Sequence, residues 1–146
     1  NALKVDFRHN NYYLDFQDNL KNLERGQTPF SPATTLFMQV NERMHRNLEK
    51  GIGNVIAATR EKALYFRRLC AKYGWEIPAH NPANAVTGFF VHKNADILCD
   101  ELQKHGIFIM PSGKPHFFRV SHMGSDTYQD LDDLAGLISE IENLPR

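Results

Sequence analysis

The stretch "HFFRVSHMG", residues 116–124, places an arginine inside a short run of apolar and aromatic residues. Aromatic and β-branched residues favour strands, and side chains alternate between the two faces of a strand. One face then carries Phe118 and Val120. The opposite face carries Phe117, Arg119 and Ser121. The pattern predicts a strand over 116–123 that buries its first face and presents Arg119 on its second.

Helix and strand patterns continue on both sides of this strand. Apolar residues spaced three and four apart predict helices over residues 10–26, 31–51, 54–74, 94–106 and 126–143. Runs rich in β-branched and aromatic residues predict further strands over residues 75–78, 85–92 and 107–110. Because only a tight turn separates 107–110 from 116–123, we expect these two strands to pair with each other in antiparallel fashion.

Residues with known capping preferences mark where the helices begin. Ser31 is expected to cap the second helix, with Pro32 at its first helical position. Asn54 is expected to cap the third helix, and Asp126 with Gln129 has the spacing of a capping box before the last one.

The order of elements predicts an α+β fold. We expect a two-layer small domain with a mostly antiparallel sheet of three to four strands, helices on one face, and a preceding linking helix. Residues 1–2 are interpreted as the remnant of an expression tag. Residues 3–50 are interpreted as a linking segment with an interdomain helix, and residues 51–146 as the small domain. Because no initiator methionine stands near Leu3, we expect a fragment of a longer protein.

The composition excludes several classes of function. The 146 residues hold 17 Lys and Arg against 17 Asp and Glu, and this neutral balance argues against a nucleic-acid clamp or an anionic membrane surface. The apolar runs are far shorter than the roughly 20 residues of a membrane span. Cys70 and Cys99 are interpreted as reduced thiols of a cytoplasmic protein, although a disulfide between them stays open. The seven histidines lack metal-ligand spacing.

Arg119 is the first candidate for a functional role. A guanidinium on a rigid strand is suited to a bidentate grip on a carboxylate, phosphate or phosphonate group. Two structural alternatives stay open at this point: a surface arginine that faces solvent, or an arginine held in an internal ion pair.

The segment "QTPFSP", residues 27–32, is the second candidate. It leads into a helix, whose N-terminal N–H groups and dipole attract phosphate, and Thr28 and Ser31 add two hydroxyl donors. The alternative is that Ser31 only caps its own helix. His122 is a third candidate because it follows the arginine strand, but a lone histidine is more often structural.

Several segments together resemble a known family. The segments "YYLDFQDNLKN", "GQTPFSPATTLFMQVNERM", "NVIAATREKALYFRRLCAKYG", "GIFIMPSG" and "FFRVSHMG" resemble the C-terminal part of class V aminotransferases. The most similar group is the serine–pyruvate, alanine–glyoxylate and 2-aminoethylphosphonate type, which are fold-type I pyridoxal-phosphate enzymes. "RVSHMG" is the most specific piece, because it matches the family signature R-[IV]-[GS]-x-[ML]-G.

The resemblance implies a role for each candidate. Arg119 matches the arginine that binds the acid group of the substrate, an amino acid or aminophosphonate, or a 2-oxo acid such as pyruvate or glyoxylate. Thr28 and Ser31 match hydroxyl positions that reach the phosphate of the pyridoxal 5'-phosphate bound by the neighbouring subunit of a homodimer. The Schiff-base lysine of the family belongs to a large domain upstream. The resemblance therefore implies a C-terminal small domain that is inactive without that missing large domain.

Two other interpretations remain beside this one. The chain could be a non-enzymatic α+β module that binds a small anion or a partner protein and shares only its descent with the transaminases. Desulfurases and lyases share the same fold and form the other alternative. Desulfurases need a mobile catalytic cysteine, and the placement of Cys70 and Cys99 inside predicted helices disfavours that reaction.

Overall fold

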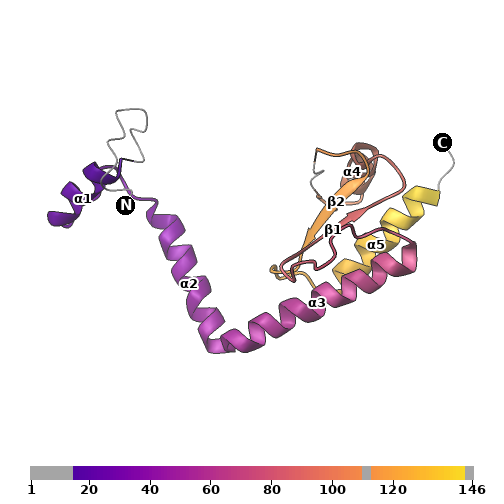
Figure 1. Cartoon of the computed structure of the whole chain (residues 1–146), viewed down its shortest axis with the longest axis horizontal. Coiled ribbons are helices and arrows are strands. Elements are labelled where there is room, and N and C mark those ends of the chain that lie inside the picture. Colours follow the sequence, from indigo (N-terminus) through magenta and orange to yellow (C-terminus); the bar gives the residue numbers. More distant parts are fainter. Residues whose placement is uncertain (1–14, 110–112, 144–146) are drawn as a thin grey trace. The chain divides into compact units, whose positions relative to one another are not determined.

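Figure 1 shows the computed structural model of the chain, which describes residues 15–109 and 113–143. The chain divides into two compact units, the first ending at Glu49 and the second beginning at Lys50. Some predictions concern residues outside the described ranges: the tag remnant at 1–2, the start of the first helix at 10–14, Met110, and part of the turn at 111–115.

The described residues of the first unit form two helices, α1 (Phe16–Glu24) and α2 (Thr34–Lys50, whose last residue belongs to the second unit). The side chain of Asp15 caps α1 by accepting hydrogen bonds from the backbone N–H groups of Gln17 at 2.8 Å and Asp18 at 3.1 Å. Such a cap satisfies donors that have no partner inside the helix, and it fixes where the helix starts.

The start of α2 corrects a prediction. The helix begins at Thr34, so Ser31 and Pro32 lie outside it and Ser31 does not cap it. The backbone N–H of Thr34 donates to the carbonyl of Pro32 at 2.8 Å, which forms a tight turn just before the helix. This turn delays the first helical residue, because the backbone of Pro32 is engaged in the turn instead of opening the helix.

The second unit contains three helices and two strands among its described residues. They are α3 (Ile52–Tyr73), β1 (Val86–Phe90), α4 (Ala95–Lys104), β2 (Phe117–Ser121) and α5 (Tyr128–Asn143). Asn94 caps α4, because its side chain accepts a hydrogen bond from the backbone N–H of Asp96 at 2.8 Å. Gly74 ends α3 in the left-handed conformation, with φ 74°, which is favourable for glycine.

Two predicted helix caps are wrong in position. Gly51 stands at the N-cap of α3, and the side chain of Asn54 donates to the carbonyl of Lys50 at 2.8 Å instead of capping α3. The capping box before α5 is shifted by one residue from the predicted pair. Thr127 N–H donates to Asp130 Oδ2 at 2.6 Å, and Asp130 N–H donates back to Thr127 Oγ1 at 3.2 Å.

The sheet has two antiparallel strands among the described residues, β1 and β2, rather than three to four. Instead of the strand predicted at 75–78, the structure has an isolated antiparallel bridge between Glu76 and Phe90. Residues 107–109 form no strand, so the predicted pairing with 116–123 is wrong there. The reason is local: the N–H of Ile107 donates to the carbonyl of Leu102 at 3.0 Å and so closes the end of α4.

The core lies between one face of the sheet and the helices. Figure 1 shows α3 and α5 side by side against the strands, and both helices contribute side chains to this core, as does α4. Phe66, Phe89 and Phe118 are fully buried, and the rings of Phe66 and Phe89 meet edge to face with centroids 5.2 Å apart. The predicted α+β class is confirmed, and aromatic packing stabilises the strand that carries Arg119.

The second face of the sheet is open. As the alternation predicted, Phe118 and Val120 are buried and Arg119 is exposed. The ring of Phe117 lies over the backbone of Gly88: a Cβ atom added at Gly88 would come within 2.6 Å of Phe117 Cζ. Because Gly88 has no side chain, the tip of this ring can approach the backbone of Gly88, which is the register partner of Arg119.

Candidate anion-binding site

Arg119 occupies the centre of β2, where the backbone is held by pairing with β1 along the whole strand. Its side chain is exposed on the open face. Within residues 15–109 and 113–143, no carboxylate forms an ion pair with its guanidinium, and no hydrogen bond of that group is found. The guanidinium is thus accessible to an anion that approaches the open face of the sheet.

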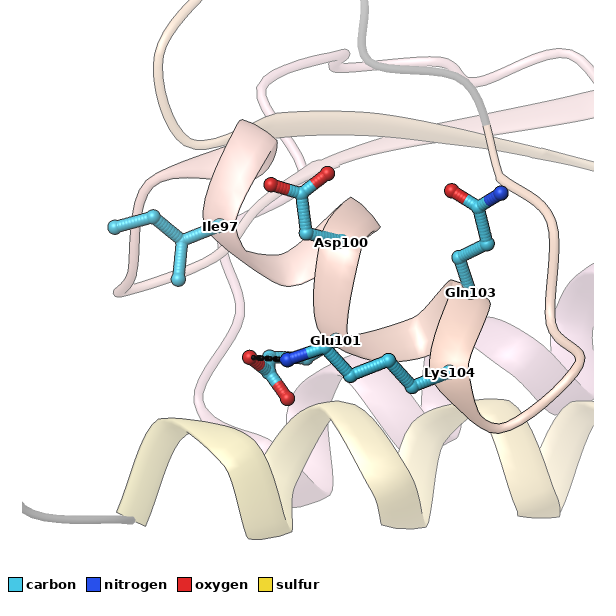
Figure 2. Close-up of a pocket in the computed structure, with 5 residues that line it drawn as sticks. All are labelled: Ile97, Asp100, Glu101, Gln103 and Lys104. Atoms are coloured by element: carbon cyan, nitrogen blue, oxygen red, sulfur yellow. Dashed lines mark hydrogen bonds and ion pairs between the residues drawn. The ribbon is translucent and has the colours of Figure 1, made fainter.

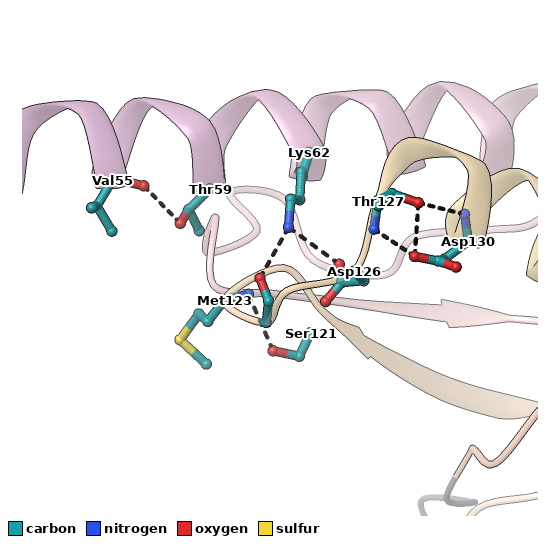
Figure 3. A network of polar contacts seen from close by, with 9 residues as sticks. Val55, Thr59, Lys62, Ser121, Met123, Asp126, Thr127 and Asp130 are labelled. Carbon is teal, nitrogen blue, oxygen red and sulfur yellow. Dashed lines mark hydrogen bonds and ion pairs between the residues drawn. The ribbon is translucent and has the colours of Figure 1, made fainter. Parts of the chain in front are cut away.

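The turn after β2 is fixed by a lysine from α3. Figure 3 shows Lys62 reaching from α3, with its Nζ donating to the carbonyl of Gly124 at 3.0 Å and lying 3.6 Å from Asp126 Oδ2. Inside the same turn, the backbone N–H of Met123 donates to Ser121 Oγ at 3.4 Å. These contacts set the backbone path directly after the strand that carries Arg119.

His122 is a structural residue in this arrangement. It is only 1% exposed, and its Nε2 lies 2.8 Å from Thr87 Oγ1 on the neighbouring strand. Arg67 Nε donates to the same Thr87 oxygen at 3.3 Å, and Arg67 Nη2 donates to the carbonyl of Ala83 at 2.7 Å. Since the Thr87 oxygen accepts from Arg67, the hydroxyl proton is available to His122 Nε2, which then acts as acceptor. The structural interpretation of His122 is confirmed by its burial.

The surroundings of His122 favour its neutral form. Burial, followed by the positive charge of Arg67, lowers the pKa of the imidazole below its usual 6.5. The charged groups around it are Arg67 and Lys62 on α3 and Asp126 before α5, and Asp126 opposes the shift. His122 Nδ1 and Asp126 Oδ2 are buried without a hydrogen-bond partner among the described residues.

We expect the stability of the chain to fall on mild acidification because of His122. Well above pH 6.5 the imidazole is neutral in both the folded and the unfolded state, so a change of pH does not alter stability through this group. Below about 6.5 the unfolded state binds the proton first, so stability falls until the lower pKa of the folded state is passed. One proton gives a slope of at most about 1.4 kcal/mol per pH unit. Urea midpoints of wild type and His122→Gln at pH 7.5 and 5.5 measure this. If the urea midpoints of wild type and His122→Gln changed equally with pH, His122 would not be the source of the pH dependence.

Thr28 and Ser31 belong to the first unit, and Arg119 belongs to the second. The Thr28 hydroxyl donates to the carbonyl of Phe30 at 2.6 Å, which shapes the turn. Ser31 is exposed, and its hydroxyl has no hydrogen bond to any residue that the structure describes. Because Ser31 does not cap α2, its hydroxyl remains available to an external acceptor such as a phosphate oxygen.

A hollow of about 580 Å³ lies on the exposed side of α4, as Figure 2 shows. It is lined by Ile97, Asp100, Glu101, Gln103 and Lys104. The one lysine is already paired, with Lys104 Nζ 2.7 Å from Glu101 Oε1. The remaining carboxylate makes this hollow unsuited to an anionic ligand, and it includes none of the predicted site residues.

Other kinds of site find no support in the described part of the chain. Cys70 and Cys99 are free thiols, and burial raises the pKa of Cys70 to about 12, so it stays protonated and unreactive near neutral pH. No three His, Cys, Asp or Glu side chains among the described residues gather closely enough to hold a metal ion. Among these residues, no helix combines the length and the apolar character needed to cross a membrane.

Sequence reasoning missed the residues that support the strand of Arg119. Alternation over 85–92 places Thr87 on the buried face with Phe89, so its burial was readable from the sequence. Its partners Arg67 and His122 come from distant segments, and only the tertiary structure brings them together. The sequence around Lys62 does not indicate its contact with the turn after β2, because a lysine on an amphipathic helix normally faces solvent.

Comparisons with known proteins give a fold but no family. No family model matches the sequence, and no curated protein matches it significantly. Among solved structures, an aspartate aminotransferase of subgroup IV from Thermus thermophilus superposes with a TM-score of 0.69 at 20% identity, covering 90% of this chain. A phosphoserine aminotransferase from Cytophaga hutchinsonii gives 0.70 at 12% identity over 88% of this chain. An 8-amino-7-oxononanoate synthase from Francisella tularensis gives 0.57 at 16% identity over 84%.

These matches extend over nearly all of this chain but only part of the other proteins. The chain spans 39% of the length of the aspartate aminotransferase and 37% of each of the other two. At such low identity the likeness shows a shared fold. The chain therefore has the fold of a part of these larger proteins, two of which are aminotransferases.

Proposed function

We propose that the chain is the C-terminal small domain of a pyridoxal-phosphate-dependent aminotransferase of the class V type. The full-length enzyme would move an amino group between an amino acid or aminophosphonate and a 2-oxo acid such as pyruvate or glyoxylate. One observation carries this proposal: an exposed and unpaired Arg119 stands on a rigid strand, in a fold shared with part of two aminotransferases.

Arg119 would bind and orient the acid group of the substrate. A guanidinium donates two parallel hydrogen bonds to such a group, which fixes both its position and its plane. Because β2 is paired along its length and packed through Phe118, the guanidinium projects from a stiff base. Holding the acid group still fixes the substrate carbon that must lose its proton, and small errors in such positioning are costly.

The described residues of the first unit suit a contact with the cofactor phosphate. The Ser31 hydroxyl is exposed and unbonded among the described residues, and that of Thr28 is exposed at the same turn. We propose that both hold the phosphate of pyridoxal 5'-phosphate from the neighbouring subunit of a homodimer, with the Thr28 hydroxyl turning its proton from the carbonyl of Phe30 to a phosphate oxygen. When bound, the cofactor supplies the electron sink that stabilises negative charge on the substrate carbon. The lysine that anchors it would come from the large domain.

The apolar stripe of α2 supports the existence of a covering partner. Phe37, Val40, Met44 and Leu48 are each more than half exposed in the structure. Exposed apolar patches of this kind mark interaction surfaces in stable proteins. We propose that the missing large domain, or its counterpart in the homodimer, covers this stripe. The free thiols of Cys70 and Cys99 support a cytoplasmic setting for the enzyme.

An activity screen tests the proposed function. The full-length protein, loaded with pyridoxal 5'-phosphate, is incubated with a panel of amino acids and aminophosphonates together with pyruvate or glyoxylate. We expect alanine or glycine to form with at least one donor, and the same mixture without enzyme is the control. If no donor supports amino transfer while the loaded protein is folded, the non-enzymatic anion-binding interpretation replaces this one.

A further inference from the structure

We infer that Ser121 is a second donor to the acid group held by Arg119, so that the site on the open face grips three oxygens rather than two. This inference rests on the proposed function, because it takes Arg119 as the residue that meets the substrate anion. It adds a specificity residue for anions that carry three oxygens, such as a phosphonate.

The two side chains leave the same face of the same strand. Arg119 and Ser121 are separated by two positions on β2 and are both exposed, with the buried Val120 between them on the other face. Two positions along a strand correspond to about 7 Å, which the long arginine side chain spans easily. Opposite Arg119 stands Gly88, which adds no side chain to this face, and the ring of Phe117 covers its backbone.

The turn after β2 orients the Ser121 hydroxyl. Ser121 Oγ accepts a hydrogen bond from the N–H of Met123, so a lone pair of the oxygen is directed back toward the turn. The hydroxyl proton has no acceptor among the described residues and can be donated to an external anion. Lys62 keeps the turn in place through the carbonyl of Gly124, as Figure 3 shows.

The combined donors match a particular shape of anion. A guanidinium occupies two oxygens of an acid group with its parallel N–H donors, which satisfies a planar carboxylate. A tetrahedral phosphonate keeps a third oxygen, and a hydroxyl beside the guanidinium is suited to reach it. Ser121 should therefore contribute more to the binding of a phosphonate than to that of a carboxylate.

Titrations with two small anions test this inference without any turnover. Methylphosphonate and acetate are titrated into the ¹⁵N-labelled chain, and binding is followed through backbone and arginine side-chain N–H signals. We expect Ser121→Ala to weaken methylphosphonate binding about tenfold and acetate binding less than threefold. Ser121→Thr, which keeps a hydroxyl on the strand, should restore binding of methylphosphonate to within about twofold of wild type.

The controls separate this inference from the proposed function. Ser125→Ala removes an exposed hydroxyl from the same turn and should leave both affinities unchanged. If Arg119→Ala abolishes binding but Ser121→Ala changes methylphosphonate binding less than twofold, the role of Ser121 is wrong and the arginine site stands. If wild type binds neither anion, the inferred role of Ser121 is also wrong. The aminotransferase proposal is tested separately by the activity screen.

Discussion

Replacing Arg119 by alanine in the full-length enzyme that we propose is expected to lower kcat/KM for its acidic substrates about a hundredfold or more. The substitution removes a bidentate, charge-assisted grip, and the substrate then loses both affinity and orientation. The kcat/KM of Arg119→Lys should lie between those of wild type and Arg119→Ala, because an ammonium group keeps the charge but cannot form two parallel hydrogen bonds. Steady-state kinetics with a donor found in the activity screen measure both variants.

A matched control identifies an effect that is specific to this position. Arg60 is an exposed arginine on α3, and Arg60→Ala should leave kcat/KM within about twofold of wild type. Circular dichroism of the Arg119→Ala variant should match that of wild type, since the exposed side chain has no hydrogen bond or ion pair among the described residues. A folded Arg119→Ala enzyme that retains kinetics within a few-fold of wild type would remove Arg119 from the site.

Phe89→Ala is expected to destabilise the chain by about 3–5 kcal/mol, the range found for large aromatic residues in cores. Phe89 is fully buried on β1 and its ring lies between those of Phe66 at 5.2 Å, Trp75 at 5.3 Å and Phe118 at 6.1 Å. Removing it leaves a cavity beneath the strand pair and ends three aromatic contacts at once. Since small proteins are stable by only about 5–15 kcal/mol, this is a large share of the total.

The neighbouring residue provides the comparison. Phe90 lies on the open face, where its ring is only partly buried and faces Phe117 with centroids 4.9 Å apart. Phe90→Ala should cost less than half as much as Phe89→Ala, because its ring already contacts solvent. Urea denaturation of both variants and wild type at pH 7.5 gives the difference. Equal losses for the two variants would show that the packing centre lies elsewhere than between the sheet and the helices.

Helices could be predicted from the sequence more closely than strands. Each predicted helix exists in the described residues, because three- and four-residue spacing is a property of the segment itself. The prediction of a strand at 107–110 is wrong over 107–109. A strand needs a pairing partner, and the backbone N–H of Ile107 instead donates to the end of α4. Competing hydrogen-bond partners for the same backbone group are not visible in a local pattern.

Helix starts show the same limit on a smaller scale. Ser31 has the preferred chemistry of a cap, yet a turn through Pro32 and Thr34 comes first. Thr127 and Asp130 form the capping box one residue after the predicted pair. Several residues with capping chemistry stand close together at both helix starts, and the choice among them depends on how the preceding turn packs.

Of the candidate site, the exposure of Arg119 could be predicted from the sequence, but the contacts that support its strand could not. Period-two alternation alone predicted the exposed face of Arg119, because that face follows from the buried positions of Phe118 and Val120. The polar contacts from Arg67 through Thr87 to His122 join α3, β1 and the residue directly after β2, and no sequence spacing connects them. Predicting it would require knowing in advance which strand lies beside β2.

The contact between the Phe117 ring and the backbone of Gly88 has an evolutionary consequence. An alanine at position 88 would bring its Cβ within 2.6 Å of Phe117 Cζ, so the ring would have to shift. Substitutions at positions 88 and 117 are therefore coupled in evolution. A side chain at position 88 is accommodated more readily in a descendant that carries a smaller residue at position 117.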